Sequence, residues 1–153
     1  MRVNEIIGDA GRIALCGVGN VERGDLGFGV YLAEALLKAV RNPSFLTLNC
    51  HDVPESQAGA IVRFRPDLLI IAVSLDFGGR PGTVVVADPW DALDDVPEEF
   101  RFQLKVTLDY LRGLLPATRF ELLGSQPGSE EGVTEEVKNC VRALAIAFKD
   151  AVD

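Results

Sequence analysis

Two aspartates and the chain's one histidine are the residues best suited to chemistry. Asp25 stands in a glycine-rich segment, GVGNVERGDLGFGV, that runs from Gly17 to Val30. Asp76 opens a second glycine-rich loop, DFGGRPG, and His51 lies between these two segments in the sequence. Carboxylates and an imidazole can together hold a metal ion or activate a water molecule for hydrolysis. The three residues are therefore candidate catalytic residues.

Each of these candidates also has a structural interpretation. Asp25 comes just before a predicted helix, where an acid can cap the helix or interact with its dipole. Asp76 lies in a glycine-rich loop, where aspartate is a common turn former. His51 has no second histidine to work with and fits a surface position, while Cys50 and Cys16 fit small buried positions.

The elements that must position these residues follow from the apolar pattern. Strands are predicted over 12–16, 45–49, 68–74, 83–87 and 119–124, and helices over 29–41, 55–65, 103–114 and 134–152. We expect the strand 83–87 to pair antiparallel with the strand before it, because only a short loop separates them. Thr134 is expected to cap the last helix.

Continuous apolar strands such as LLIIAV are typical of a sheet that is covered on both faces. The pattern predicts one α/β domain over residues 1–153, a three-layer sandwich with a mostly parallel five-stranded sheet between helices. Ligands of such sheets bind at the carboxyl ends of the strands. The glycine-rich segment, residues 49–52 and the loop 74–79 are all expected at that edge.

The glycine-rich segment does not fit nucleotide binding. Glu22 occupies the place of the third glycine that a dinucleotide fingerprint needs after Gly17-Val18-Gly19. The segment also lacks the lysine and the Ser/Thr of a phosphate-binding loop.

Its spacing, Gly17-Val18-Gly19-Asn20 and then Gly24-Asp25-Leu26-Gly27-Phe28-Gly29, resembles the signature of the hydrogenase maturation endopeptidases. Further family-like segments follow in order: VPES, RPDLLII, DFGGRPGTV, VADP, LDYL and LLGSQP. The resemblance covers essentially the whole chain and is greatest to the formate-hydrogenlyase branch.

This resemblance implies a five-stranded sheet between helices and a protease that removes a C-terminal extension from the NiFe-hydrogenase large subunit. The expected partner is the large-subunit precursor, with Gly19, Asn20, Cys50 and His51 as substrate-binding residues. Cys50 and His51 replace what is a glycine pair in many relatives.

The three metal ligands of the family fall on aliphatic residues in this chain. By the resemblance they correspond to Leu26, Val73 and about Leu104, with an uncertainty that spans residues 103–105. Aliphatic side chains have no lone pairs for a metal. We therefore expect no metal at the family site, with nickel reaching the protein only through its substrate, unless Asp25, Asp76 and His51 form a replacement site.

Two functions related to hydrogenase maturation remain open after this comparison. The chain is either a protease that acts on the precursor without a metal site of its own, or an inactive relative that serves as a binding or assembly factor. A small-ligand binder is a third reading. Trp90, Phe100 and Phe102 flank an acidic segment that is either a solvated loop or part of a peptide-binding wall.

Charge and composition narrow the partners. With 23 acidic and 15 basic residues the chain carries a net charge of −8, which repels nucleic acid and anionic membranes. No signal-like or membrane-spanning apolar stretch is present, so we expect a soluble cytoplasmic protein. The three widely spaced cysteines predict reduced thiols rather than a disulfide framework.

Overall fold

A computed structural model describes residues 3–153 and contains a single five-stranded sheet. Its strands are β1 (Ile13–Val18), β2 (Phe45–His51), β3 (Leu68–Ser74), β4 (Val84–Ala87) and β5 (Arg119–Ser125). The order across the sheet is β2-β1-β3-β5-β4, and every neighbouring pair is parallel except β4 with β5. A mostly parallel sheet is therefore confirmed.

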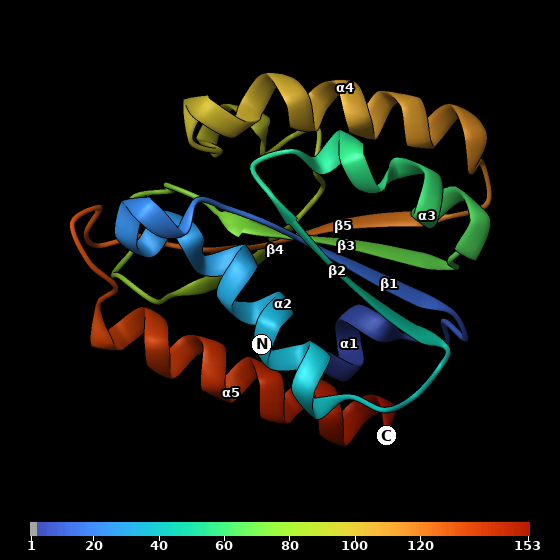
Figure 1. The fold of residues 1–153 in the computed structure, drawn as a ribbon, viewed down its shortest axis with the longest axis horizontal. Helices are drawn as coiled ribbons and strands as arrows, with labels where there is room; N and C mark the ends of the chain where they lie inside the picture. The colour runs from blue at the N-terminus through green and yellow to red at the C-terminus, as the bar shows by residue number, and fades with distance from the viewer. Residues whose placement is uncertain (1–2) are drawn as a thin grey trace.

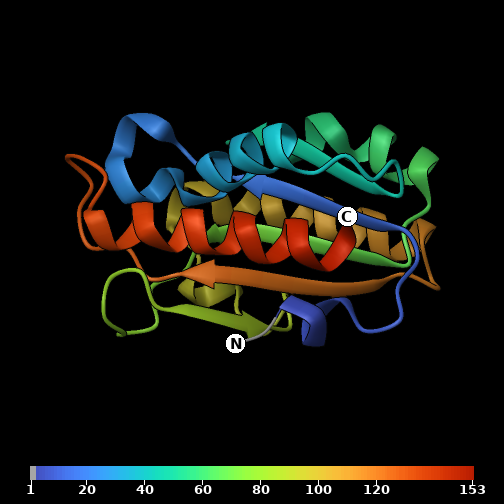
Figure 2. The same ribbon diagram turned by 90° about the horizontal axis from the view of Figure 1, so that it is seen from below.

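Helices cover both faces of the sheet, which confirms the three-layer sandwich (Figure 1). One layer holds α3 (Ala58–Phe64) and α4 (Glu98–Leu114), and the other holds α1 (Val3–Ile7), α2 (Phe28–Ala39) and α5 (Glu135–Val152). Figure 2 shows α5 lying along its face of the sheet. Short 3₁₀ segments, η1 (Val21–Gly27), η2 (Pro54–Gln57) and η3 (Leu93–Asp95), complete the fold.

The alternation of side chains along β3 divides the core into two clusters. Leu69, Ile71 and Val73 face the α3–α4 layer, and the residues between them face the α2–α5 layer. All seven residues of β3 are buried, as a central strand covered on both faces requires. This strand spans the predicted residues 68–74.

The predicted partner of β4 is wrong. β4 pairs antiparallel with β5, with Val84 opposite Ser125, and does not touch β3 as a strand. A hairpin pairing was expected because the loop is short, but β5 already occupies the edge of β3 from Leu68 to Ser74. The chain therefore crosses to the outer edge of the sheet.

Other differences concern the helix boundaries. The predicted helix 55–65 is divided into η2 and α3, and α4 begins at Glu98 rather than at 103. The short helix α1 carries only five residues and was not predicted. Thr134 does cap α5, because its side chain accepts a hydrogen bond from the Val137 N–H. Within residues 3–153, every helix is too short or too polar to cross a membrane.

Candidate functional site

The glycines of the signature segment let α2 approach the sheet closely. A Cβ atom on Gly17 would lie 2.1 Å from the Gly29 carbonyl oxygen, and one on Gly29 would lie 2.1 Å from the Ala72 carbonyl oxygen. No side chain fits at either position, so these two glycines serve helix–strand packing rather than a ligand. The packing places η1 directly at the carboxyl end of β1.

A cleft opens beside η1 at this edge of the sheet. Its volume is about 490 Å³, and its lining includes two prolines and the residues Arg23, Leu26, Asp76, Glu98, Glu99 and Glu130. These residues come from η1, from the loop after β3, from the first turn of α4 and from the loop before α5. Four carboxylates against one guanidinium make the cleft acidic.

Arg23 joins two walls of this cleft. Its guanidinium donates to Glu99, with an N–O distance of 2.6 Å, and to Glu130, and these two carboxylates raise the pKa of Arg23. Asn20 also donates to Glu99, at 3.3 Å, while its own carbonyl oxygen Oδ1 accepts from the Glu22 N–H. The beginning of α4 is thus tied to η1 by polar contacts.

Asp25 is fully buried and faces the loop before α5. Its carboxylate accepts from the N–H groups of Gly128 at 2.7 Å, Ser129 at 3.1 Å and Thr134 at 2.8 Å, and from the Thr134 hydroxyl at 2.9 Å. It does not cap α2, where the prediction placed it. A carboxylate that is fully buried and accepts from four donors anchors the loop, and it is not exposed to solvent water that it could activate.

Asp76, by contrast, is exposed and lines the cleft. Its Oδ1 accepts from the side-chain amide of Gln126 at 2.9 Å. The carbonyl oxygen of the same buried Gln126 accepts from the N–H groups of Phe77 and Gly79. Gln126 therefore fixes the loop and the carboxylate together, a role that sequence reasoning missed although it noted the segment LLGSQP.

His51 lies away from the cleft lining, at the end of β2. It is exposed and adopts a left-handed backbone with φ of 47°. Its carbonyl oxygen accepts from the Gly19 N–H at 2.9 Å, so two of the predicted substrate-binding residues meet through their backbones. The imidazole does not join Asp25 and Asp76, since residues 3–153 contain no cluster of three His, Cys, Asp or Glu side chains with the geometry to bind a metal.

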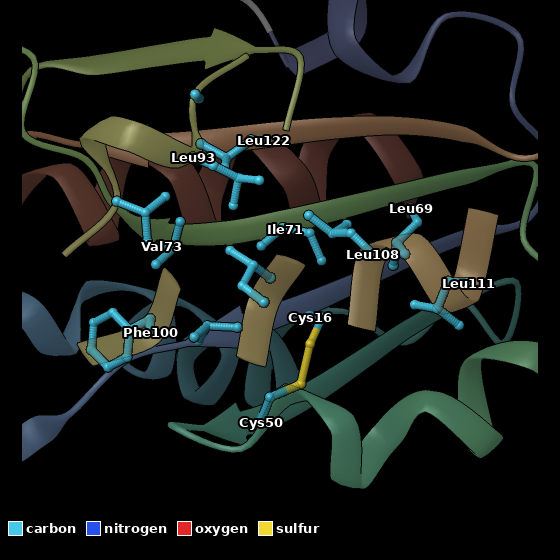
Figure 3. Close-up of a cluster of buried hydrophobic side chains, with 14 of the residues drawn as sticks. Cys16, Cys50, Leu69, Ile71, Val73, Leu93, Phe100, Leu108, Leu111 and Leu122 are labelled. Atoms are coloured by element: carbon cyan, nitrogen blue, oxygen red, sulfur yellow. A yellow bond between two sulfur atoms is a disulfide. The ribbon is translucent and has the colours of Figure 1, made fainter. Parts of the chain in front are cut away.

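Cys16 and Cys50 form a disulfide, which contradicts the expectation of reduced thiols. The bridge joins β1 to β2 inside the core of the α3–α4 layer (Figure 3). Both cysteines are buried, so the side chain of Cys50 does not reach a substrate at the surface. The sequence did not predict this pairing, because the two cysteines are 34 residues apart and belong to no cysteine-spacing motif.

The positions that the resemblance assigns to the family's metal ligands lie in one apolar cluster. Leu26, Val73 and Leu104 all belong to the buried side chains between the sheet and α4, where Figure 3 shows Val73 near Phe100. Their side chains carry no donor atom for nickel or zinc. The residues present therefore do not fit the metal that the family implies.

Comparisons with known proteins give the context for this site. No protein-family model matches the chain. The Hydrogenase 3 maturation protease of Escherichia coli K12 is 32% identical over 138 residues, which cover 86% of this chain and 85% of that protein.

Two solved structures extend the comparison. The NiFe hydrogenase maturation protease HycI of Thermococcus kodakarensis superimposes with a TM-score of 0.85 and 32% identity, over 98% of this chain and 97% of that one. The hydrogenase maturating endopeptidase HybD of E. coli shares the fold, with a TM-score of 0.75 and 24% identity over 90% of this chain and 89% of that one. The chain therefore belongs to the hydrogenase maturation protease family.

Proposed function

We propose that this chain acts in the cytoplasm on the C-terminal region of a NiFe-hydrogenase large-subunit precursor. The observation that carries the proposal is the 490 Å³ cleft, which lies at the carboxyl edge of the sheet and is lined on one side by Arg23 and Leu26 of the family's signature segment. An extended chain end fits such an open cleft, where Leu26 offers an apolar contact. Asp76 is the one of the three candidate catalytic residues that lines the cleft and could meet the precursor there.

The chain does its work without a metal ion of its own. Leu26, Val73 and Leu104 contribute only aliphatic contacts, and Asp25 is committed to the loop before α5. Any nickel at this site would therefore come bound to the precursor. Titration of the purified protein with nickel or zinc alone should show no stoichiometric heat of binding.

A second function, that of a binding or assembly factor which does not hydrolyse the precursor, is favoured by the same aliphatic cluster. Hydrolysis of an amide needs an activated water, a nucleophile or a placed general base. Of the three candidate catalytic residues only Asp76 lines the cleft, and one of its oxygens already accepts from Gln126. The two functions share the docking step and differ in whether a peptide bond breaks.

One experiment tests docking and cleavage together. The protein is mixed with the large-subunit precursor from the same genome, in nickel-loaded and in nickel-free form. Complex formation is followed by calorimetry, and the precursor's mass is followed by intact mass spectrometry. A complex with loss of the C-terminal extension supports the protease, and a complex with unchanged mass supports the assembly factor. Absence of both would refute the proposed function.

A pair of variants tests the cleft itself. Glu98→Arg reverses a charge in the cleft at the first turn of α4, and Glu135→Arg makes the same change at the first turn of α5, outside the cleft lining. Both glutamates are exposed, so both variants should fold. We expect Glu98→Arg to weaken precursor binding at least tenfold and Glu135→Arg to leave it within twofold.

A further inference from the structure

We propose that the outer side of α4 binds the folded body of the precursor whose C-terminal region lies in the cleft. The surface consists of Phe102, Val106, Tyr110 and Leu114 and is called here the α4 strip. The inference rests on the proposed function and adds to it a second contact, separate from the cleft. The expected partner surface is apolar.

The α4 strip is the largest gathering of exposed apolar side chains within residues 3–153. Its four members are between 48% and 72% exposed, with Phe102 the most exposed. The other large exposed hydrophobic residues within residues 3–153 are scattered over η1, α2, the segment before η2, β4 and α5, with Leu37 on α2 and Ile146 on α5. Contiguous apolar surface of this kind usually marks a binding site, whereas single exposed apolar residues are ordinary.

The strip also has a shaped recess. A groove of about 360 Å³ lies between α4 and the η2–α3 segment, lined by Glu55, Ala58, Gly59, Val106, Thr107 and Tyr110. Ala58 and Gly59 are small, so the walls are formed by larger side chains, among them Val106 and Tyr110. An aromatic or branched side chain of a partner fits between such walls, as anchor residues do at protein interfaces.

The strip continues directly from the cleft, and this continuity identifies the occupant. Glu98 lines the cleft, and the four α4 members of the strip follow it at intervals of four residues. Because a helix has about 3.6 residues per turn, each step of four residues rotates the row by about 40°. Adjacent members therefore adjoin, while the whole row winds about 120° around the helix from Phe102 to Leu114. From Phe102 to Leu114 the row runs for roughly 18 Å.

A precursor held by its C-terminal region in the cleft must place its remaining body next to the cleft walls. The first turn of α4 is one of those walls, so the body meets the strip that extends from it. Phe102, which sequence analysis considered for a peptide-binding wall, lies on this strip. Phe100 is instead fully buried, and Trp90 packs against Phe120 with ring centroids 5.4 Å apart.

The test compares two ligands and two double variants. The ligands are the full-length precursor and a synthetic peptide of its C-terminal region, and binding to each is measured by calorimetry. The double variant Phe102→Glu with Val106→Glu alters the strip. The control, Leu37→Glu with Ile146→Glu, places the same charges on exposed apolar positions of α2 and α5. Circular dichroism checks that both variants are folded.

We expect the strip variant to bind the full-length precursor at least tenfold more weakly and the peptide within twofold of the wild type. The control should match the wild type with both ligands. Unchanged affinity of the strip variant for the full-length precursor would overturn this inference and leave the cleft proposal intact. If the wild type binds neither ligand, the proposed function itself fails. Sedimentation tests a different occupant. If the wild type sediments as a dimer and the strip variant as a monomer, while their affinities for the precursor are equal, the strip joins two copies of this chain and the inference is wrong.

Discussion

Replacing Asp25 should destabilise the protein far more than replacing an ordinary loop aspartate. Its carboxylate satisfies three backbone N–H groups and one hydroxyl between Gly128 and Thr134. Asp25→Ala removes the acceptor from all four donors. A buried donor left without a partner costs roughly 1–3 kcal/mol, and the lower end applies because this loop can partly re-hydrate. The expected loss is therefore about 4 kcal/mol in the free energy of unfolding.

Asp25→Asn should cost less, because the geometry of the amide keeps most of the acceptor. Oδ2 accepts from three donors and Oδ1 accepts only from the Thr134 N–H. The asparagine oxygen can replace Oδ2, which leaves its NH₂ group facing one N–H. We expect a loss of about 2 kcal/mol, one lost charge-assisted hydrogen bond.

Urea unfolding followed by circular dichroism measures these differences. For a domain of this size, 4 kcal/mol corresponds to a fall in Tm of roughly 8–16 °C. Asp150→Ala is the control, because Asp150 is exposed near the end of α5, and it should change the stability by less than about 1 kcal/mol. An Asp25→Ala protein as stable as the wild type, or an Asn variant as unstable as the Ala variant, would refute this account of the buried carboxylate.

Three further predictions concern packing, pH and thiols. Gly29→Ala should cost at least about 2 kcal/mol in urea unfolding, because its Cβ would meet the Ala72 carbonyl oxygen; Gly113→Ala, which meets nothing within 4 Å, should be neutral or slightly stabilising. Hydrogen bonds from Lys105 and then from the Trp90 indole lower the pKa of Asp109 from its ordinary value of 3.8. The ionised Asp109 therefore stabilises the fold above pH 3.8, and this stabilisation is lost as the pH falls through the lowered pKa. The Tm difference between wild type and Asp109→Asn should therefore shrink between pH 7 and pH 2, and a constant difference would contradict this. Burial raises the pKa of the Cys140 thiol, so this cysteine should be alkylated slowly in the native protein at pH 8. Alkylation should label one cysteine in the native protein and three after reduction and denaturation. Three labels without a reductant would contradict the disulfide.

The layers of this fold could be predicted from the sequence, because a strand that is apolar throughout must be covered on both faces of the sheet and the intervening helices provide that cover. The strand Leu68–Ser74 is apolar throughout, and Thr134 precedes a clear helical pattern with acids in its first turn. These signals are local. The partner of β4 depends on which edge of the sheet is free, and this is decided by β5, which lies more than thirty residues further along the chain.

The site was less predictable for the same physical reason. Asp25 was recognised as a residue of interest, but its partners lie more than a hundred residues away in the loop before α5. Gln126 acts through contacts with Asp76, Phe77 and Gly79, which a single glutamine in a sequence does not reveal. Asp76 could be predicted to lie at the carboxyl edge, since a loop that follows a parallel strand must begin there.

The Cys16–Cys50 bridge has a practical consequence for work with this protein. It closes a 34-residue stretch of chain, a constraint worth about 3–4 kcal/mol in models of unfolded-chain entropy. The stretch contains the whole of η1 and α2, and so one wall of the cleft. Thiol reductants added to protect a nickel-containing precursor would thus also loosen the protein that is meant to receive it. Binding to the precursor should therefore be assayed separately for the oxidised protein, in a buffer free of thiols and phosphines, and for the protein reduced with dithiothreitol.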